Sequence, residues 1–377
     1  MDRAAAFFSN YDAFGPRRAA SEGDLASSQW LAAQCASIAP IAARVEVGFQ
    51  RFMPGEAYLS VGGERVDGLP LFDAGLTPSD GVMGAIGPLG SDAPIGFARM
   101  SPAMASLPGN AFSQERASTR HQAIVIALTT REGGLAPLNA HDLDRPFGPP
   151  VLQIAGRDAD RVDRLIALGA QVRVVVLGRR EPAVSHNVRV ELPGERPELL
   201  LLTPRTSWWT STAERAGGIW AWVESLRALA ALPERRCRVV ALATCGHELG
   251  HIGAHQAFAQ EPELANRSAL VIHLGANLGA AVEPALTVRS NVPGLADRMA
   301  VLLVAAGYPS DAIAAVTGGK AGGEAHEIEQ RGGRYLSLIG SNPWFHAPED
   351  RWPASITLEH ATAISRAVSA MAVQQAG

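Results

Sequence analysis

Side chains that could do chemistry gather in a few short stretches of the sequence, each directly after an apolar run. His247, Glu248 and His251 follow the pattern His-Glu-x-x-His, in which two histidines one helical turn apart bind zinc and the glutamate activates water. That use requires one unbroken helix, whereas this pattern follows its apolar run directly and contains Gly250, with Gly253 just beyond it. The spacing therefore allows two interpretations: a helical zinc motif, or a loop that follows a strand.

Other stretches carry polar and aromatic side chains in the same kind of place. Arg205 and His346 each follow an apolar run, and Glu214 and Arg215 open a helical pattern. In an α/β sheet, the loops that leave the carboxyl ends of parallel strands bring their side chains into a shared crevice. We therefore expect these side chains to lie around one ligand pocket.

The elements that must position these stretches alternate between strand and helix patterns in the second half of the sequence. Short apolar runs bounded by polar loops predict strands, and apolar residues three or four apart predict the helices between them. Such alternation predicts an α/β fold with a mostly parallel sheet and helices on both faces. The predicted strands span residues 199–202, 239–243, 269–274 and 335–339, and the predicted helices span residues 218–230, 295–306 and 357–373.

The first half of the sequence has a different texture. A helix pattern at residues 24–38 and a strand pattern at residues 44–52 come first. Glycine- and proline-rich turns then separate short β-type runs, which predicts a small β-rich module. Within it we predict strands at residues 124–128 and 172–177 and a helix at residues 159–168.

Composition and charge narrow the class of protein. The 377 residues are 47% hydrophobic and 19% charged, which excludes a disordered or fibrous chain. A net charge of -4 without long single-sign runs favours neither nucleic acid nor a membrane surface as a partner. We expect a small molecule or a short peptide as substrate, and the sequence leaves the oligomeric state open.

Two features bear on the cellular compartment. The first residues lack the continuous apolar core of a signal peptide, and no apolar run is long enough to span a bilayer. The 3 cysteines, an odd number without the CxxC spacing of metal sites, fit a reducing compartment. We therefore expect a cytoplasmic protein.

Taken in order along the chain, the motifs resemble those of the M28 family of zinc aminopeptidases. Residues 15–22 resemble the family's Gly-x-Arg-x-x-Gly-Ser lead-in, and residues 214–224 resemble its Asp-Asn-x-x-Gly helix start. Residues 246–250 resemble Gly-Glu-Glu-x-Gly, and residues 345–350 resemble Tyr-His-Thr-x-x-Asp. The matches run in family order over nearly the whole chain.

The resemblance implies a division into two domains. Residues 1–52 and 194–377 would form a zinc-exopeptidase-like α/β domain. Residues 53–193 would form a protease-associated-like inserted domain. The stretch at residues 149–154 resembles part of such an insert.

Part of the family's usual two-metal ligand set is missing from this sequence. The family's first histidine ligand falls on Pro204, and the aspartate that accompanies it falls on Thr206. A late aspartate ligand falls on Gly275, which has no side chain. The resemblance therefore implies that one of the two metal ions has lost its own ligands.

The other ion's ligands have counterparts. The bridging aspartate becomes Glu214, the metal-binding glutamate remains as Glu248, and the last histidine ligand remains as His346. A catalytic zinc needs about three protein ligands and an open position. Glutaminyl cyclases, which are relatives of the M28 family, likewise use one zinc held by an acidic pair and a histidine. We expect zinc as the cofactor, with at most one ion bound to this set.

Four residues are candidates for catalytic roles around that ion. His247 falls in the general-base position and could move protons. Arg205 and Arg215 could clamp a carboxylate or stabilise an oxyanion. His251 is a candidate because it is the second histidine of the helical zinc motif. For His251 and Arg205 a purely structural role also stays open.

These residues imply one function and one alternative. The first is a metal-dependent hydrolase acting on an amide or related bond of a small, carboxylate-bearing molecule. The alternative is a catalytically inactive relative that binds a small molecule or a partner protein through the same pocket.

Overall fold

The computed structural model of the chain describes residues 2–105, 109–118 and 120–377, and a sheet of 13 strands runs through it. Its second half consists of β8 (Glu195–Pro204), β9 (Cys237–Thr244), β10 (Leu270–Leu274), β11 (Leu286–Ser290), β12 (Ile313–Thr317) and β13 (Tyr335–Gly340). The strands β9, β8, β10 and β13 lie side by side and parallel. β11 pairs antiparallel with β13, and β12 pairs parallel with β11 at the edge.

Both faces of the parallel strands are covered by helices. Leu199 and Leu201 of β8 pack into one apolar core, and Leu200 and Leu202 pack into another on the opposite face. A strand buried on both faces has no reason to alternate with polar residues, which explains the continuous apolar run in this sequence.

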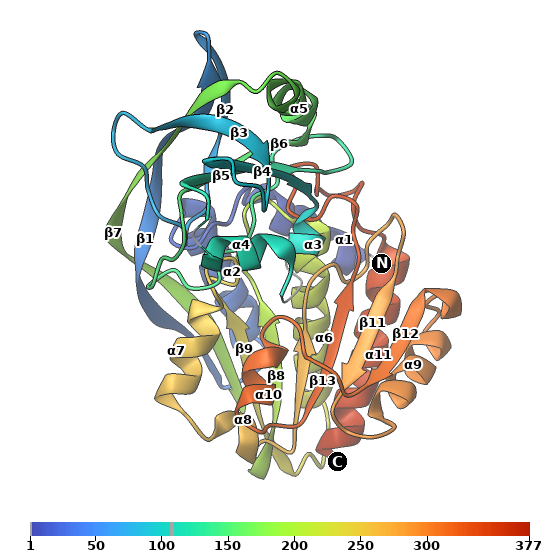
Figure 1. Cartoon of the computed structure of the whole chain (residues 1–377). Helices are drawn as coiled ribbons and strands as arrows, with labels where there is room; N and C mark the ends of the chain where they lie inside the picture. The colour runs from blue at the N-terminus through green and yellow to red at the C-terminus, as the bar shows by residue number, and fades with distance from the viewer. Residues whose placement is uncertain (1, 106–108, 119) are drawn as a thin grey trace.

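The helices divide between the two faces (Figure 1). One face carries α1 (Asp2–Ala13), α2 (Glu22–Ala36), α6 (Gly217–Ala230), α9 (Leu295–Ala305) and α11 (Leu358–Ala376). The other face carries α7 (Ile252–Gln260), α8 (Leu264–Arg267) and α10 (Ala325–Gln330). Two of the helices begin at side-chain caps: the Ser21 hydroxyl accepts a hydrogen bond from the backbone N–H of Asp24, and Thr357 caps α11 in the same way. Short turns of other helical types lie at η1 (Gly156–Asp158), η2 (Thr212–Ala216) and η3 (Ser310–Ala312).

The first half of the sheet forms a β-rich part at the top of Figure 1. Its strands are β1 (Ile41–Val61), β2 (Glu64–Pro70), β3 (Val82–Pro88), β4 (Ile95–Met100), β5 (Ala123–Leu128), β6 (Val151–Ala155) and β7 (Gln171–Leu192). Its helices are α3 (Pro102–Ala105), α4 (Ala111–Ser118) and α5 (Ala159–Ala167). α5 packs on one face of β5, through Val162, and α4 packs on the other face, through Phe112.

The long strands β1 and β7 connect the β-rich part to the parallel sheet. They pair antiparallel from Ile41 opposite Glu191 to Ser60 opposite Arg173. The end of β7, at Val188 to Leu192, then pairs with β9 in the parallel sheet. The sheet has no break at residue 53 or 193, and the predicted division into two domains there stays a prediction.

The predicted fold class is confirmed as an α/β fold with a mostly parallel sheet and helices on both faces. Each strand and helix predicted above is present, with ends that differ by a few residues except in the long strands β1, β7 and β8. Each helix of the described ranges is too short or too polar to cross a membrane. The cytoplasmic compartment stays a prediction.

Candidate functional site

A cavity of about 630 Å³, the central cavity, lies where the β-rich part covers the carboxyl ends of the parallel strands. His247 after β9, His273 at the end of β10 and Ile339 in β13 line it. Leu71 and Phe112 contribute apolar lining from the β-rich part. The cavity therefore lies at the sheet edge where the alternation of strands and helices predicts a ligand.

Histidines make up much of the polar lining of the central cavity. Of the chain's 10 histidines, most lie on its wall, where an imidazole can bind a metal ion or move a proton. The lining histidines are His141, His247, His251, His255, His273 and His326.

Two of these histidines form a close group with a buried glutamate. The ligand atoms that His247, His251 and Glu324 can offer all lie within 4.8 Å of one another. Nδ1 of His247 lies 2.8 Å from Oε1 of Glu324, and the rings of the two histidines are 4.9 Å apart between centroids. A metal ion needs at least three such ligand atoms close together. Among the described residues, His247, His251 and Glu324 are the histidine, cysteine or acidic side chains that meet this condition.

A loop, and not a helix, brings His247 and His251 together. Gly246, Gly250 and His251 have positive φ angles of 67°, 79° and 58°, and α7 begins only at Ile252. A Cβ on Gly246 would lie 2.2 Å from the Ile252 side chain, so a glycine is needed at that turn. The helical form of the His-Glu-x-x-His motif is therefore absent, although its two histidines do meet.

Glu248 points away from the two histidines of the motif. Its carboxylate accepts hydrogen bonds from the backbone N–H of Ala19 at 3.1 Å and from the Thr206 hydroxyl at 2.7 Å. It is 1% exposed and does not line the central cavity. Glu248 therefore ties the loop after β9 to the loop before α2.

Glu324 is held by a second buried histidine. Nε2 of His273 lies 3.3 Å from Oε2 of Glu324, and Nδ1 of His273 lies 2.8 Å from the Ser337 hydroxyl. Burial lowers the pKa of His247 to about 4. Burial opposes the charged form of Glu324, but His247 and His251 outweigh it and hold its pKa well below the usual range. At neutral pH the group thus contains a neutral imidazole of His247 and a carboxylate.

Glu214 and His346 meet at a second place, and neither side chain lines the central cavity. Nε2 of His346 lies 3.6 Å from Oε1 of Glu214, and Nη2 of Arg215 lies 2.8 Å from the same oxygen. All three side chains are at most 1% exposed. The resemblance predicts zinc between Glu214, Glu248 and His346.

The residues at this second place do not fit a metal ion as they stand. A guanidinium already neutralises Glu214, and Glu248 uses both carboxylate oxygens in hydrogen bonds elsewhere. The metal set expected from the resemblance stays a prediction. The group of His247, His251 and Glu324 fits better, because it has zinc-type donors, a buried carboxylate and an adjoining cavity.

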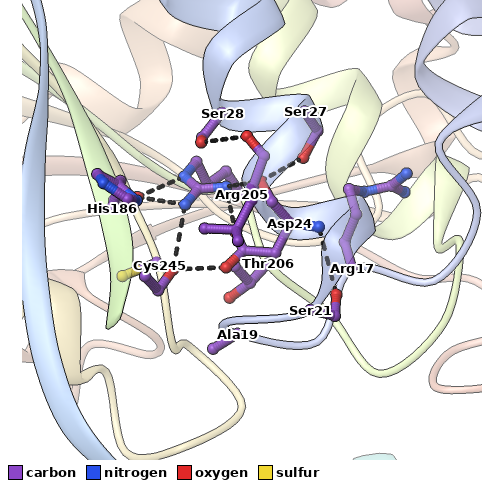
Figure 2. A network of polar contacts seen from close by, with 12 residues as sticks. Arg17, Ala19, Ser21, Asp24, Ser27, Ser28, His186, Arg205, Thr206 and Cys245 are labelled. Atoms are coloured by element: carbon purple, nitrogen blue, oxygen red, sulfur yellow. Dashed lines mark hydrogen bonds and ion pairs between the residues drawn. The ribbon is translucent and has the colours of Figure 1, made fainter. Parts of the chain in front are cut away.

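Arg205 lies in a buried polar network away from the central cavity (Figure 2). Its Nη1 lies 2.5 Å from Oδ1 of Asp24, and its Nε donates to the backbone carbonyl of His186 at 2.8 Å. The Ser185 hydroxyl donates to the other oxygen of Asp24 at 2.6 Å. The guanidinium thus fastens α2 to β7 in this structure, which is the structural role left open for it above.

Asp350 supports the turn that carries Glu214. Its carboxylate accepts the backbone N–H groups of Ala213 at 2.8 Å and Glu214 at 2.9 Å. Burial raises the pKa of Asp350 to about 6, well above the usual range of an aspartate. The native state therefore binds this proton more tightly than the unfolded chain does.

We predict a pH-dependent stability from Asp350. The contribution is complete below about pH 4 and is lost as the pH rises through about 6, because only the native state favours the proton there. At about 1.4 kcal/mol per pKa unit, this carboxyl can contribute at most about 3 kcal/mol. Urea unfolding at pH 4, 5, 6 and 7 should show this decline, and Asp350→Asn should flatten it. Equal pH slopes in both proteins would contradict the assignment.

Glu324 and His273 belong to the site, but the sequence gives little indication of either residue. The polar His273 inside an apolar strand is a weak signal, because most such histidines serve packing. Glu324 follows a glycine-rich stretch at residues 318–323, far in sequence from His247. Only the fold brings the two segments together.

Comparisons with known proteins identify the fold. No protein-family model matches the sequence, and no curated protein matches it. A zinc aminopeptidase from Bacillus subtilis is similar in structure, with a TM-score of 0.75 and 17% identity over 99% of this chain and 94% of that one. A peptidase M28 precursor from Shewanella amazonensis has a TM-score of 0.73 and 16% identity over 100% and 94% of the two chains. An aminopeptidase from an Aneurinibacillus strain has a TM-score of 0.71 and 18% identity over 100% and 93%. The structural resemblance expected from the motifs is therefore confirmed.

Proposed function

We propose that this chain, which has the fold of the M28 zinc aminopeptidases, is a metal-dependent hydrolase with its active centre in the central cavity. The supporting observation is the group of His247, His251 and Glu324, whose possible ligand atoms lie within 4.8 Å of one another on the wall of that cavity. Two imidazoles and a carboxylate are a common ligand set of catalytic zinc, which keeps an open position for substrate. The proposal is for one such ion per chain.

Neighbouring side chains would fix the orientation of the three proposed ligands. His273 contacts the carboxylate of Glu324 and is itself fixed by Ser337 in β13. Glu327 lies beside His251 at 3.9 Å and is bound by Arg331 at 2.7 Å. Such outer contacts fix the orientation of ligands. A zinc ion bound here would supply a Lewis acid that polarises the substrate carbonyl.

The cavity also supports the expected kind of substrate. Its imidazoles offer N–H donors to a carboxylate, and Leu71, Ala105 and Phe112 offer an apolar surface to a side chain. His255 lies half-exposed on the wall, 3.2 Å from Glu327, and adds a further imidazole to the polar lining. We therefore propose hydrolysis of an amide or related bond in a small molecule that bears a carboxylate.

Metal content of protein purified without chelators tests the proposal. We expect about one zinc per chain by elemental analysis. His251→Ala and Glu324→Gln should each reduce that content to near zero, because each removes one of three ligands. His326→Ala is the matched control, since it removes a cavity imidazole outside the group. It should keep the ion.

Activity follows from the same protein preparations. A panel of N-acetyl amino acids, which contain an amide and a carboxylate, serves as substrates. Their hydrolysis should release free amino groups. A chelator should abolish this hydrolysis, and added zinc should restore it. A full zinc content in both His251→Ala and Glu324→Gln would refute the proposed ligands. Loss of zinc in Glu248→Gln and His346→Ala, with retention in His251→Ala, would instead favour the set expected from the resemblance. Absence of any metal after zinc addition would favour the inactive binding protein.

A further inference from the structure

Three asparagine side chains line the central cavity, and they come from both of its walls. Asn139 precedes β6 in the β-rich part, whereas Asn277 follows β10 and Asn342 follows β13 in the parallel sheet. β10 and β13 pair directly, so Asn277 and Asn342 lie at neighbouring strand ends. Each carboxamide has an acceptor oxygen and a donor nitrogen without a charge. What these side chains can bind therefore depends on which of the two groups the protein itself uses.

Backbone groups fix the direction of two of the carboxamides. Nδ2 of Asn277 donates to the backbone carbonyl of Gly340 at 3.3 Å, and a carbonyl can only accept, so the acceptor Oδ1 is left over. Oδ1 of Asn342 accepts from the backbone N–H of Trp344 at 3.0 Å, so the donor Nδ2 is left over. The two neighbouring side chains thus present one acceptor and one donor.

An indole fixes the direction of the third carboxamide. Oδ1 of Asn139 accepts from the ring N–H of Trp208 at 3.0 Å, and an indole N–H can only donate. Nδ2 of Asn139 is therefore left to donate to a ligand. Together the three side chains offer two donors and one acceptor to a molecule in the central cavity.

Two of the groups left over are buried and unpaired. Oδ1 of Asn277 and Nδ2 of Asn342 have no hydrogen-bond partner among the described residues, and the two residues are 7% and 8% exposed. Buried polar groups normally have a partner in the protein, in ordered water or in a bound molecule. An unpaired acceptor and an unpaired donor on the lining of one cavity indicate a ligand that donates to the first and accepts from the second.

We propose that Asn139, Asn277 and Asn342 form an amide subsite of the central cavity, which selects substrates by an uncharged amide group other than the bond that is cleaved. An amide donates through its N–H and accepts through its C=O, which matches the groups left over. A carboxylate can only accept, so it would place an acceptor against Oδ1 of Asn277. An alkyl or thioether group would leave the polar groups of the subsite unpaired, which is unfavourable in a buried site.

The charges on the cavity wall support an uncharged group at the amide subsite. Arg116 is the guanidinium among the described lining residues, and its Nη2 lies 3.0 Å from the carboxylate of Asp73, which neutralises it. Recognition at the amide subsite therefore depends on the direction of hydrogen bonds and not on an ion pair. The inference rests on the proposed function for the reaction, but the selection of the ligand can be measured without turnover.

Three N-acetyl amino acids of similar side-chain length test the amide subsite. N-acetyl-glutamine ends in a carboxamide, N-acetyl-glutamate in a carboxylate and N-acetyl-methionine in a thioether. Binding to the full chain is measured by titration calorimetry after treatment with a chelator, so the result depends on neither metal nor hydrolysis. We expect N-acetyl-glutamine to bind about tenfold or more tightly than either of the others, because each of them leaves polar groups of the subsite unpaired.

Substitutions of asparagine by aspartate test the named side chains. Asn342→Asp and Asn139→Asp each keep the oxygen that accepts from a tryptophan N–H, and each replaces the donor left over by an acceptor. Each should lower the ratio of the affinities for N-acetyl-glutamine and N-acetyl-methionine by about tenfold. The added charge and any loosening of the fold act on both ligands and cancel in the ratio. Asn266→Asp is the matched control, because Asn266 is exposed in α8, and its ratio should equal that of the parent protein.

Two outcomes would overturn the inference. The first is equal affinity of the parent protein for the three ligands. The second is an unchanged ratio in Asn342→Asp and Asn139→Asp, and Asn139→Asp decides alone if Asn342→Asp does not fold.

Hydrolysis of the same three molecules by zinc-loaded protein separates this inference from the proposed function. Hydrolysis of all three together with equal binding would keep the proposed function and remove the amide subsite. Selective binding of N-acetyl-glutamine without hydrolysis would keep the amide subsite and favour the inactive binding protein.

Discussion

Arg205→Met should lower the free energy of unfolding by about 3–5 kcal/mol, because it leaves Asp24 as a buried, unpaired carboxylate. The two side chains are 2% and 0% exposed, and they are joined at 2.5 Å. The lost guanidinium also served the backbone carbonyl of His186. Urea unfolding followed by tryptophan fluorescence measures the difference.

A surface ion pair provides the matched control for this effect. Arg145→Met removes a partner of Asp142 at 2.7 Å, but Arg145 is 88% exposed, so the cost should stay below about 1 kcal/mol. The double variant Asp24→Asn with Arg205→Met should recover much of the loss, because it leaves no buried charge. A cost of Arg205→Met as small as that of Arg145→Met would show that the network in Figure 2 is not a stabilising one.

Gly217→Ala should prevent stable folding or cost more than about 3 kcal/mol, which is the upper end of ordinary overpacking. A Cβ at this position would lie 1.6 Å from the carbonyl oxygen of Leu278 and 2.7 Å from its carbon. Both are backbone atoms, so no side-chain rotation can relieve the contact. α6 would have to move away from the loop after β10.

Gly48→Ala is the control for backbone freedom alone. It lies in β1, where an added Cβ meets nothing within 4 Å and φ is not positive. Its effect should stay within about 1 kcal/mol of zero. A similar small effect for Gly217→Ala would mean that α6 does not approach the loop after β10 as closely as described.

The strands and their loops are predictable because the physical signal is local. Residues 199–202 are apolar throughout since both faces of β8 are covered, and polar residues begin where the strand ends. Boundaries of this kind are enough to predict that Arg205, Glu214 and His247 lie at one edge of the sheet. The roles of these residues are harder to predict, because side-chain direction depends on the packed fold.

Particular residues illustrate the limit. The spacing of His247 and His251 suggests a shared ligand, but one-dimensional spacing cannot distinguish a helical turn from the glycine loop that brings them together. Glu324 completes that group from a segment more than 70 residues away, and no local pattern marks it. Arg215 points inward because the Thr206 carbonyl and the Glu214 carboxylate hold it there.

The β1–β7 ladder has a mechanical consequence for the central cavity. Nearly every residue of β1 from Ile41 to Ser60 is paired with β7, and β7 continues into the parallel sheet beside β9. A hinge rotation of the β-rich part would have to break this ladder, so the two walls of the cavity behave as one rigid frame. A ligand of the central cavity would then reach the histidines past the loops and side chains of the rim. Rates of binding should depend on those loops and not on any opening between two lobes.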